Sequence, residues 1–174
     1  KALTFSPTYG MYRVSADIND AELIEVPLDQ KFQIDLTATI PYLDDFNLKL
    51  IFICSPNNPT GNLLRNSDIE MLLNRFKGIV VIDEAYIDFA DVPSWNQRLK
   101  EYDNLIVTQT FSKARGLAAA RLGIAFSNSE IISLLNKIKP PYNVSTLNQA
   151  VGLRSMKNQR DFELQIKQIK SERS

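Results

Sequence analysis

The chain has 174 residues with 20 basic and 20 acidic side chains, so its formal net charge is zero. A neutral chain has no electrostatic attraction for nucleic acid or for an anionic membrane, and we expect neither as a partner. The lack of histidine excludes Ser-His-Asp and Cys-His catalysis and any metal site that needs histidine. The single cysteine, Cys54, excludes an internal disulfide and a multi-cysteine metal cluster, so we expect no metal and a reducing, cytoplasmic location.

Short apolar segments alternate with helical patterns along the chain, which is typical of βαβ units and a mostly parallel sheet. Strands are predicted at Ala2–Phe5, Glu22–Pro27, Leu48–Cys54, Gly78–Asp83, Asn104–Thr110 and Leu122–Phe126. The third, fourth and fifth are almost continuously apolar, as in strands that are covered on both faces. We therefore predict an α/β fold with three layers, α/β/α, around a doubly wound sheet whose interior contains these three strands.

Local signals predict several helix ends between and after these strands. Ser67 and Glu70 have the spacing of a capping box, and Gly78 would end the helix that they begin. Asp35 is a candidate cap for a helix that Pro41 would kink or end early.

The last third of the chain is predicted to be helical. One helix begins at Ser129 and ends before Pro140, and from Ser145 the pattern is helical almost to the end. We expect a boundary at the Pro140–Asn143 stretch, so we divide the chain into a first part at 1–143 and a helical segment at 144–174 that would belong to a bridge or a second domain. The chain starts at a lysine and stops within an amphipathic pattern, so we expect a piece of a longer protein.

Polar side chains follow the third, fourth and fifth predicted strands at the points where these strands end. In an open parallel sheet, ligands bind beyond the carboxyl ends of the strands. The segments there are CSPNNPTG at 54–61, DEAY at 83–86 and TFSK at 110–113. We expect one edge of the sheet to carry Asn58, Asp83, Tyr86, Ser112 and Lys113.

An amine, a carboxylate, a phenol and an amide without histidine favour a cofactor that itself accepts electrons, and pyridoxal phosphate is such a cofactor. Its aldehyde needs a lysine, for which Lys113 is the candidate. Its ring nitrogen needs a carboxylate in order to stay protonated, and Asp83 fits that role. Asn58 and Tyr86 can donate hydrogen bonds to the ring oxygen.

The phosphate of this cofactor needs hydroxyl groups and a guanidinium. Thr110, Ser112 and Arg121 follow the fifth strand closely enough to surround it.

Each candidate also has a purely structural interpretation. The NPTG segment of Asn58 is a turn sequence, Asp83 can end a strand, and Tyr86 can be a core aromatic residue. Lys113 can be a solvated surface charge, and Arg121 can belong to a surface ion pair. The catalytic interpretation of Lys113 is favoured by its place after an apolar strand and before a stretch of small residues.

Four segments together resemble the fold-type I pyridoxal phosphate aminotransferases, and within that family the histidinol-phosphate aminotransferases. The segments are SPTYGMY at 6–12, SPNNPTG at 55–61, DEAYIDF at 83–89 and TFSKARGLAAARLG at 110–123. The resemblance covers nearly the whole chain. It implies that residues 1–143 are the pyridoxal-phosphate-binding large domain of that fold without its first strand. It also implies that residues 144–174 are a helical segment that leads toward the missing small domain.

The resemblance implies a contact with pyridoxal phosphate for Tyr9, Asn58, Asp83, Tyr86, Thr110, Ser112, Lys113 and Arg121. Lys113 would hold the cofactor and then move the substrate proton, and Tyr9 would stack on the cofactor ring. Ser112 and Arg121 would hold the phosphate.

The implied reaction is transamination of histidinol phosphate with 2-oxoglutarate, which gives imidazole-acetol phosphate and glutamate in histidine biosynthesis. A homodimer is implied as well. Family members are about twice as long and contain further substrate-binding groups, so we expect the segment alone to be impaired in turnover.

Two other functions stay open at this point. An aromatic aminotransferase or a threonine-phosphate decarboxylase would have the same cofactor residues. A non-catalytic α/β binding module is a further alternative, in which Lys113 is incidental. The sequence has neither a GxGxxG after a strand nor a GxxxxGK[ST], which argues against a nucleotide ligand for such a module.

Overall fold

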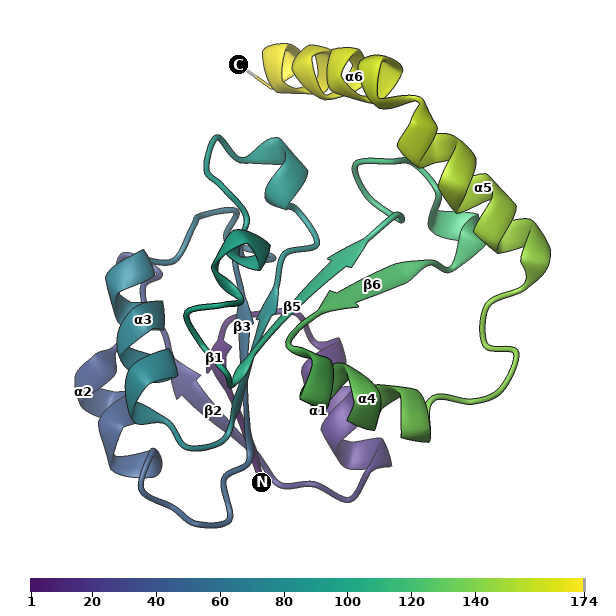
Figure 1. Cartoon of the computed structure of the whole chain (residues 1–174). Coiled ribbons are helices and arrows are strands. Elements are labelled where there is room, and N and C mark those ends of the chain that lie inside the picture. The colour runs from purple at the N-terminus through teal and green to yellow at the C-terminus, as the bar shows by residue number, and fades with distance from the viewer. Residues whose placement is uncertain (174) are drawn as a thin grey trace.

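The computed structural model describes residues 1–173 and contains a six-stranded sheet between two layers of helices (Figure 1). The strands are β1 (Ala2–Ser6), β2 (Leu23–Pro27), β3 (Leu50–Cys54), β4 (Ile79–Asp83), β5 (Leu105–Thr110) and β6 (Gly123–Phe126). Their order is β2-β1-β3-β4-β5-β6, with β1 to β5 parallel and β6 antiparallel to β5. The predicted three-layer, mostly parallel α/β class is confirmed.

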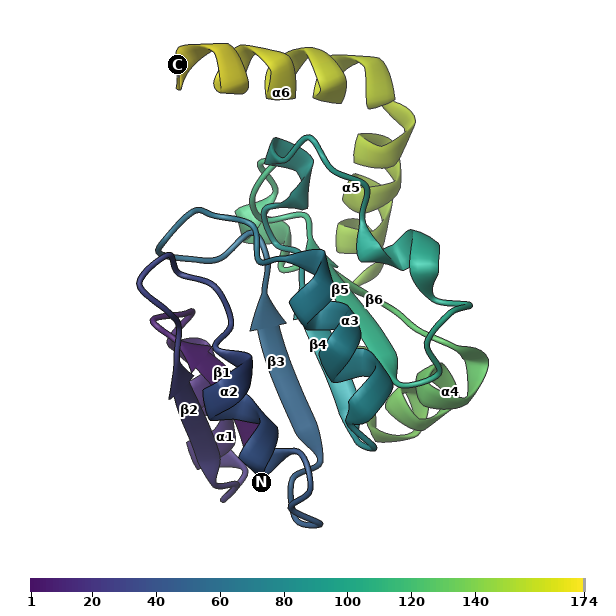
Figure 2. The ribbon, with the colours of Figure 1, turned by 90° about the vertical axis from the view of Figure 1, so that its left-hand side faces the viewer.

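Helices cover both faces of the sheet. On one face lie α2 (Leu36–Thr39) and α3 (Asn66–Arg75), and on the other lie α1 (Met11–Ile18) and α4 (Ser129–Ile138) (Figure 1). Two further helices, α5 (Thr146–Lys157) and α6 (Gln159–Glu172), follow α4, and α6 crosses above the carboxyl ends of the strands (Figure 2). Short 3-10 helices lie at η1 (Ile40–Tyr42), η2 (Ile87–Phe89), η3 (Trp95–Arg98) and η4 (Ala118–Ala120).

The apolar strands form the core because they are the interior strands of the sheet. Alternate side chains of β3, β4 and β5 are fully buried in the main core cluster, which includes residues of α3: Ile51, Ile53, Ile69, Leu72, Val80, Ile82, Leu105 and Val107. On the opposite face, Val81 and Ile106 pack with Ile131 of α4. Burial on both faces explains why these strands lack the polar alternation of half-exposed strands.

The predicted capping box is wrong. Helix α3 begins at Asn66, after Arg65 in the capping position, and no side chain caps it. Ser67 lies inside the first turn, where its hydroxyl donates a 3.3 Å hydrogen bond to Asp68 Oδ1. The helix ends at Arg75, before Gly78, because Phe76 leaves the helical conformation and its side chain is buried in the core.

The other predicted helix signals agree with the structure to within one residue. Asp35 caps α2 by accepting a 3.1 Å hydrogen bond from the Ala38 amide, and α2 ends at Thr39, before Pro41. Asn128, one residue before the predicted start, caps α4. Ser145, where the helical pattern was predicted to begin, caps α5, which starts at Thr146.

Two features of the helices were not predicted. Helix α1 begins after Gly10, which has no capping side chain, and its single buried residue is Ala16. The final helical segment is broken at Asn158, where α5 ends and α6 begins in a new direction (Figure 2). The last residue of the segment predicted at 144–174 lies outside the described residues.

Within residues 1–173, none of the helices has both the length and the apolar character needed to cross a membrane.

Gly78 joins α3 to β4 at a point where the backbone leaves no room for a side chain. A Cβ atom at this position would lie 2.5 Å from the carbonyl oxygen of Lys49. We expect Gly78→Ala to lower the free energy of unfolding by about 1–3 kcal/mol, because the backbone must move to relieve the overlap. Urea unfolding followed by circular dichroism measures this loss. Gly10→Ala is the matched control, since no atom lies within 4 Å of its added Cβ, and an equal loss in both variants would contradict the steric explanation.

Candidate active site

The parallel register brings the last residues of the central strands to one edge of the sheet. Cys54 at the end of β3 pairs with Asp83 at the end of β4, and Asp83 pairs with Thr108 of β5. The loops that follow these strands enclose a cavity of about 310 Å³. All eight predicted site residues line this cavity: Tyr9, Asn58, Asp83, Tyr86, Thr110, Ser112, Lys113 and Arg121.

Asp83 is a half-buried carboxylate that is held by two hydrogen bonds. Its Oδ2 accepts a 2.8 Å bond from the Tyr12 hydroxyl, and its Oδ1 accepts a 3.1 Å bond from the Ala85 amide. Burial raises the pKa of Asp83 above its ordinary value, and the two hydrogen bonds oppose that rise. No basic side chain within residues 1–173 forms an ion pair with Asp83. The negative charge of this carboxylate can therefore pair with a cationic group of a ligand.

Tyr12 is the principal contact that sequence reasoning missed. Its ring stacks on Phe52 of β3 with a centroid distance of 5.2 Å, and Tyr9 packs edge-on against it at 5.7 Å. Burial and then the neighbouring charge of Asp83 raise the pKa of Tyr12, so its hydroxyl keeps the proton that it donates. Tyr12 lies in the SPTYGMY segment, three residues after Tyr9, but no local pattern pairs it with Asp83, 71 positions further along the chain.

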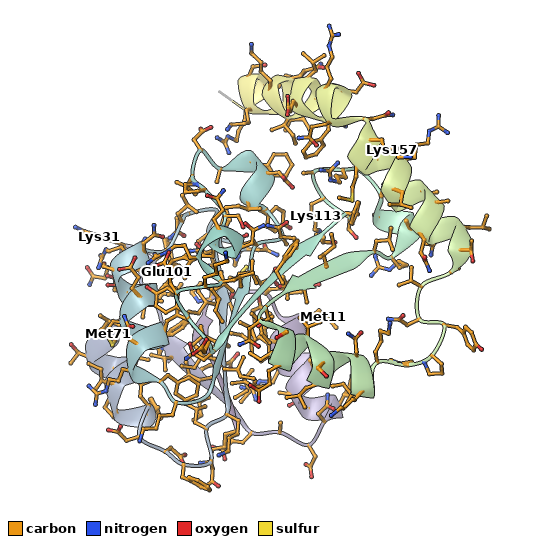
Figure 3. The ribbon with its side chains drawn as sticks, in the orientation of Figure 1. Met11, Lys31, Met71, Glu101, Lys113 and Lys157 are labelled. Carbon is orange, nitrogen blue, oxygen red and sulfur yellow. The ribbon has the colours of Figure 1, made fainter. Side chains whose placement is uncertain are left out.

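Lys113 lies in a tight turn after β5, at the end of the sheet that α6 covers (Figure 3). The turn is closed by a 2.9 Å hydrogen bond from the Gly116 amide to the Lys113 carbonyl, and Gly116 has a φ of +64° that favours glycine. The Lys113 Nζ lies 5.5 Å from the ring centroid of Tyr86. Its amine therefore faces the loop that follows Asp83, across the cavity.

The hydroxyl and guanidinium groups occupy the side of the cavity next to β5 and β6. Thr110 Oγ1 donates to the Leu122 carbonyl at 3.3 Å and accepts from the Ser112 amide at 3.1 Å, so it braces the loop. Arg121 has a left-handed backbone with φ 49° and donates to the Ala118 carbonyl at 2.9 Å. The predicted phosphate contacts of Thr110, Ser112 and Arg121 stay predictions.

The position of Asn58 is set by its neighbour Asn57. The buried side chain of Asn57 donates to the Pro7 carbonyl at 3.0 Å and to Thr60 Oγ1 at 2.7 Å, and it accepts from Thr8 Oγ1 at 2.8 Å. These bonds tie the segment before Tyr9 to the turn that contains Asn58. The two loops on this side of the cavity are thereby held at a fixed separation.

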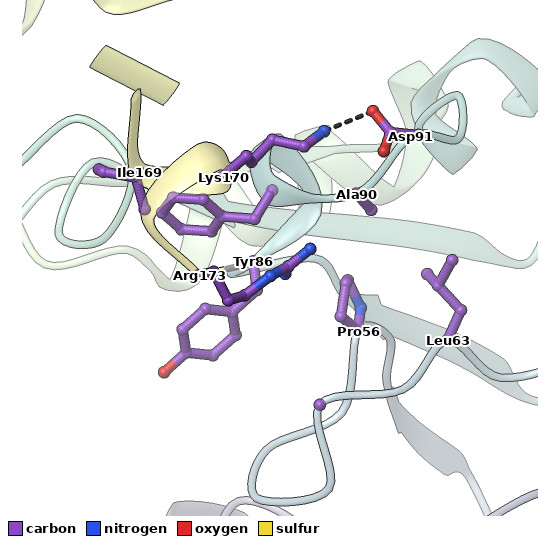
Figure 4. Close-up of a pocket in the computed structure, with 10 residues that line it drawn as sticks. Pro56, Leu63, Tyr86, Ala90, Asp91, Ile169, Lys170 and Arg173 are labelled. Atoms are coloured by element: carbon purple, nitrogen blue, oxygen red, sulfur yellow. Dashed lines mark hydrogen bonds and ion pairs between the residues drawn. The ribbon is translucent and has the colours of Figure 1, made fainter. Parts of the chain in front are cut away.

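A larger cavity, of about 470 Å³, lies beside the first and shares Tyr86 with it (Figure 4). Its walls are mainly apolar, and Lys170 of α6 pairs with Asp91 at its edge. Because the amine, the half-buried carboxylate and the amide line the smaller cavity, that cavity is the candidate active site.

The side chains of the smaller cavity fit pyridoxal phosphate. Lys113 offers an amine for the aldehyde. Asp83, which forms no ion pair with a basic side chain of residues 1–173, offers a carboxylate for the ring nitrogen. Hydroxyl groups and the guanidinium of Arg121 lie on one side of the same cavity, as a phosphate requires.

Comparison with known proteins gives a family and a set of relatives. The model of aminotransferase class I and II matches residues 1–174. A histidinol-phosphate aminotransferase from Christiangramia forsetii is 54% identical over 172 residues, which are 99% of this chain and 49% of the relative.

Two solved structures show the same fold. The histidinol-phosphate aminotransferase from Clostridium acetobutylicum superposes with a TM-score of 0.88 at 25% identity, over 99% of this chain and 53% of the other. The enzyme of that name from Sinorhizobium meliloti, solved in complex with pyridoxal-5'-phosphate, has a TM-score of 0.84 at 24% identity, over 95% of this chain and 46% of the other. The chain thus spans about half the length of the relatives that it matches.

The hydrogen bond from Tyr12 predicts a pH-dependent stability. Tyr12→Phe removes a bond that lowers the pKa of Asp83, so the pKa of this carboxyl rises further above its unfolded value. A carboxyl whose pKa is higher in the folded than in the unfolded protein stabilises the fold at pH values below its unfolded pKa. That contribution is lost as the pH rises through the folded pKa. We expect Tyr12→Phe to lower the free energy of unfolding by about 1.5 kcal/mol at neutral pH and by less in acid. Urea unfolding at several pH values tests this.

The control is the same substitution in an Asp83→Asn background, where no charge titrates at position 83. In that background, Tyr12→Phe should lower the free energy of unfolding by the same amount at every pH. If its cost is also independent of pH when Asp83 is present, the hydrogen bond does not control this carboxyl.

Proposed function

Because this chain belongs to the class I and II aminotransferase family, we propose that the whole protein transfers the amino group of histidinol phosphate to 2-oxoglutarate with pyridoxal phosphate as its cofactor. The products are imidazole-acetol phosphate and glutamate, in histidine biosynthesis. The observation that carries the proposal is that the Lys113 amine and the half-buried Asp83 carboxylate line the same cavity. The name of the relative at 54% identity supports the choice of substrate.

When bound, pyridoxal phosphate supplies the electron sink for the reaction. We propose that Lys113 Nζ would hold the cofactor through its aldehyde carbon, and that the free Lys113 amine would accept the proton of the substrate's α-carbon on Nζ. Asp83 keeps the ring nitrogen protonated, and its bond from Tyr12 fixes the orientation of the carboxylate. Asn58 and Tyr86 donate to the ring oxygen.

The remaining contacts orient the cofactor. Tyr9, which lines the wall of the cavity, would stack on the cofactor ring. Ser112 and Arg121 bind the phosphate, because a guanidinium can make bidentate contacts there. Thr110 contributes mainly by bracing the loop of Ser112.

We propose that residues 1–143 act as the cofactor-binding domain and that residues 144–174 lead toward the domain that completes the substrate site. We also propose a homodimer in the cytoplasm. Exposed apolar side chains on α4 and α5, such as Ile138 and Leu147, support an interface, and the free thiol of Cys54 supports a reducing location.

Covalent trapping tests the proposal. We expect borohydride to fix pyridoxal phosphate to Lys113 of the full-length protein, as found by mass mapping of the labelled peptide. Lys113→Ala should abolish the label and lower transamination of histidinol phosphate by at least about a thousandfold, because no other base replaces the lysine. Lys49→Ala is the matched control, since the Lys49 amine also lies over an aromatic ring, that of Phe46, at 4.0 Å.

The label and the activity should both survive in Lys49→Ala. A label on another lysine, or full activity in Lys113→Ala, would show that the assignment is wrong. Parallel assays with phenylalanine and threonine phosphate separate the alternatives. Release of carbon dioxide from threonine phosphate, without amino transfer from histidinol phosphate, would favour a decarboxylase.

A further inference from the structure

Arg115 connects the turn that carries Lys113 to the two C-terminal helices. Its NH1 group donates a 3.1 Å hydrogen bond to the carbonyl of Ser155 near the end of α5, and its NH2 group donates a 3.4 Å bond to Gln159 Oε1 at the start of α6. One side chain therefore contacts the corner between α5 and α6 from both sides of the break at Asn158.

Two aromatic rings flank the guanidinium of Arg115. Its central carbon lies 4.1 Å from the ring centroid of Phe162 in α6 and 5.7 Å from that of Phe111 at the start of the Lys113 turn. A planar guanidinium stacks on such rings in a way that a lysine ammonium does not reproduce. Arg115 also acts on Asp88 of η2. Burial raises the pKa of the Asp88 carboxyl, and the positive charge of Arg115 opposes that rise.

The turn between Phe111 and Leu117 is closed by two backbone hydrogen bonds. The Leu117 amide donates to the Phe111 carbonyl, and the Gly116 amide donates to the Lys113 carbonyl, both at 2.9 Å. Ala114, between the two cationic residues, is buried. Arg115 and Lys113 thus lie two residues apart in one hydrogen-bonded turn, so we expect a displacement of Arg115 to displace Lys113 as well.

We propose that Arg115 is a positioning residue, which holds the Lys113 turn against the corner of α5 and α6 and thereby sets where the Lys113 amine lies in the cavity. The inference rests on the proposed function of Lys113. In this proposal, the position of the Lys113 amine depends on the orientation of α5 and α6, because the Arg115 guanidinium contacts both helices and the Lys113 turn. A merely structural Arg115 would stabilise α6 without changing the reactivity of Lys113.

The test measures how fast Lys113 of the full-length protein condenses with pyridoxal phosphate, followed by the absorbance of the bound cofactor. In this step Nζ bonds to the aldehyde carbon and the aldehyde oxygen leaves as water. We expect Arg115→Met to slow the step by about tenfold, because the amine is misplaced. Arg115→Lys should be slowed similarly, since it retains the charge but not the stacked plane.

Phe162→Leu approaches the same contact from α6 and should also slow condensation. Because both substitutions break one stacked contact, their effects should not add in the double variant. Arg98→Met is the matched control: the Arg98 guanidinium also stacks on two rings, 4.8 Å from Trp95 and 5.2 Å from Tyr102, but it belongs to η3. This variant should condense at the wild-type rate.

The outcomes separate the two proposals. If the wild-type protein condenses but Arg115→Met and Phe162→Leu match its rate, the role of Arg115 is wrong and the proposed function stands. A wild-type rate in Arg115→Lys alone would assign the effect to charge and would overturn the stacking role. If the wild-type protein does not condense with pyridoxal phosphate at all, the proposed function is wrong and the inference fails with it.

Discussion

The candidate site depends on the parallel register of β3, β4 and β5. That register places Cys54, Asp83 and Thr108 side by side at the carboxyl edge of the sheet. A slip of one residue in β4 would send Asp83 to the opposite face of the sheet, where α3 packs, because successive side chains alternate between the faces. The buried residues Val80 and Ile82 oppose such a slip, since it would remove them from the main core cluster. Core packing and active-site geometry are therefore fixed by the same pairing.

This constraint gives the Asp83 carboxylate its chemical character. It lies at the end of a buried strand, where burial raises its pKa, and Tyr12 of α1 supplies a hydrogen bond that favours the charged form. No basic side chain within residues 1–173 forms an ion pair with this half-buried carboxylate. A cation that binds against it therefore stabilises its negative charge. The protonated ring nitrogen of the proposed cofactor is such a cation. The Lys113 amine reaches the same cavity from the next strand.

Much of the fold and of the candidate site could be predicted from the sequence, and each feature that the sequence analysis missed has a physical reason. The interior strands were predictable because burial on both faces leaves almost continuous apolar runs, and their polar ends marked the site. Helix α1 was missed because Gly10 provides no capping side chain and only Ala16 is buried. The bond from Tyr12 to Asp83 joins residues 71 positions apart, so no local pattern encodes it. The contacts of Arg115 with α5 and α6 depend likewise on how the chain returns over the sheet after α4.

The central claim is that Asp83 holds the ring nitrogen of pyridoxal phosphate in its protonated form while Lys113 holds the aldehyde. Nitrogen NMR of the full-length protein, loaded with cofactor labelled at the ring nitrogen, measures this directly. The account predicts the chemical shift of a protonated pyridine nitrogen in the wild-type protein and that of a neutral one in Asp83→Asn. A neutral nitrogen in the wild-type protein, or the same shift in both, would contradict it.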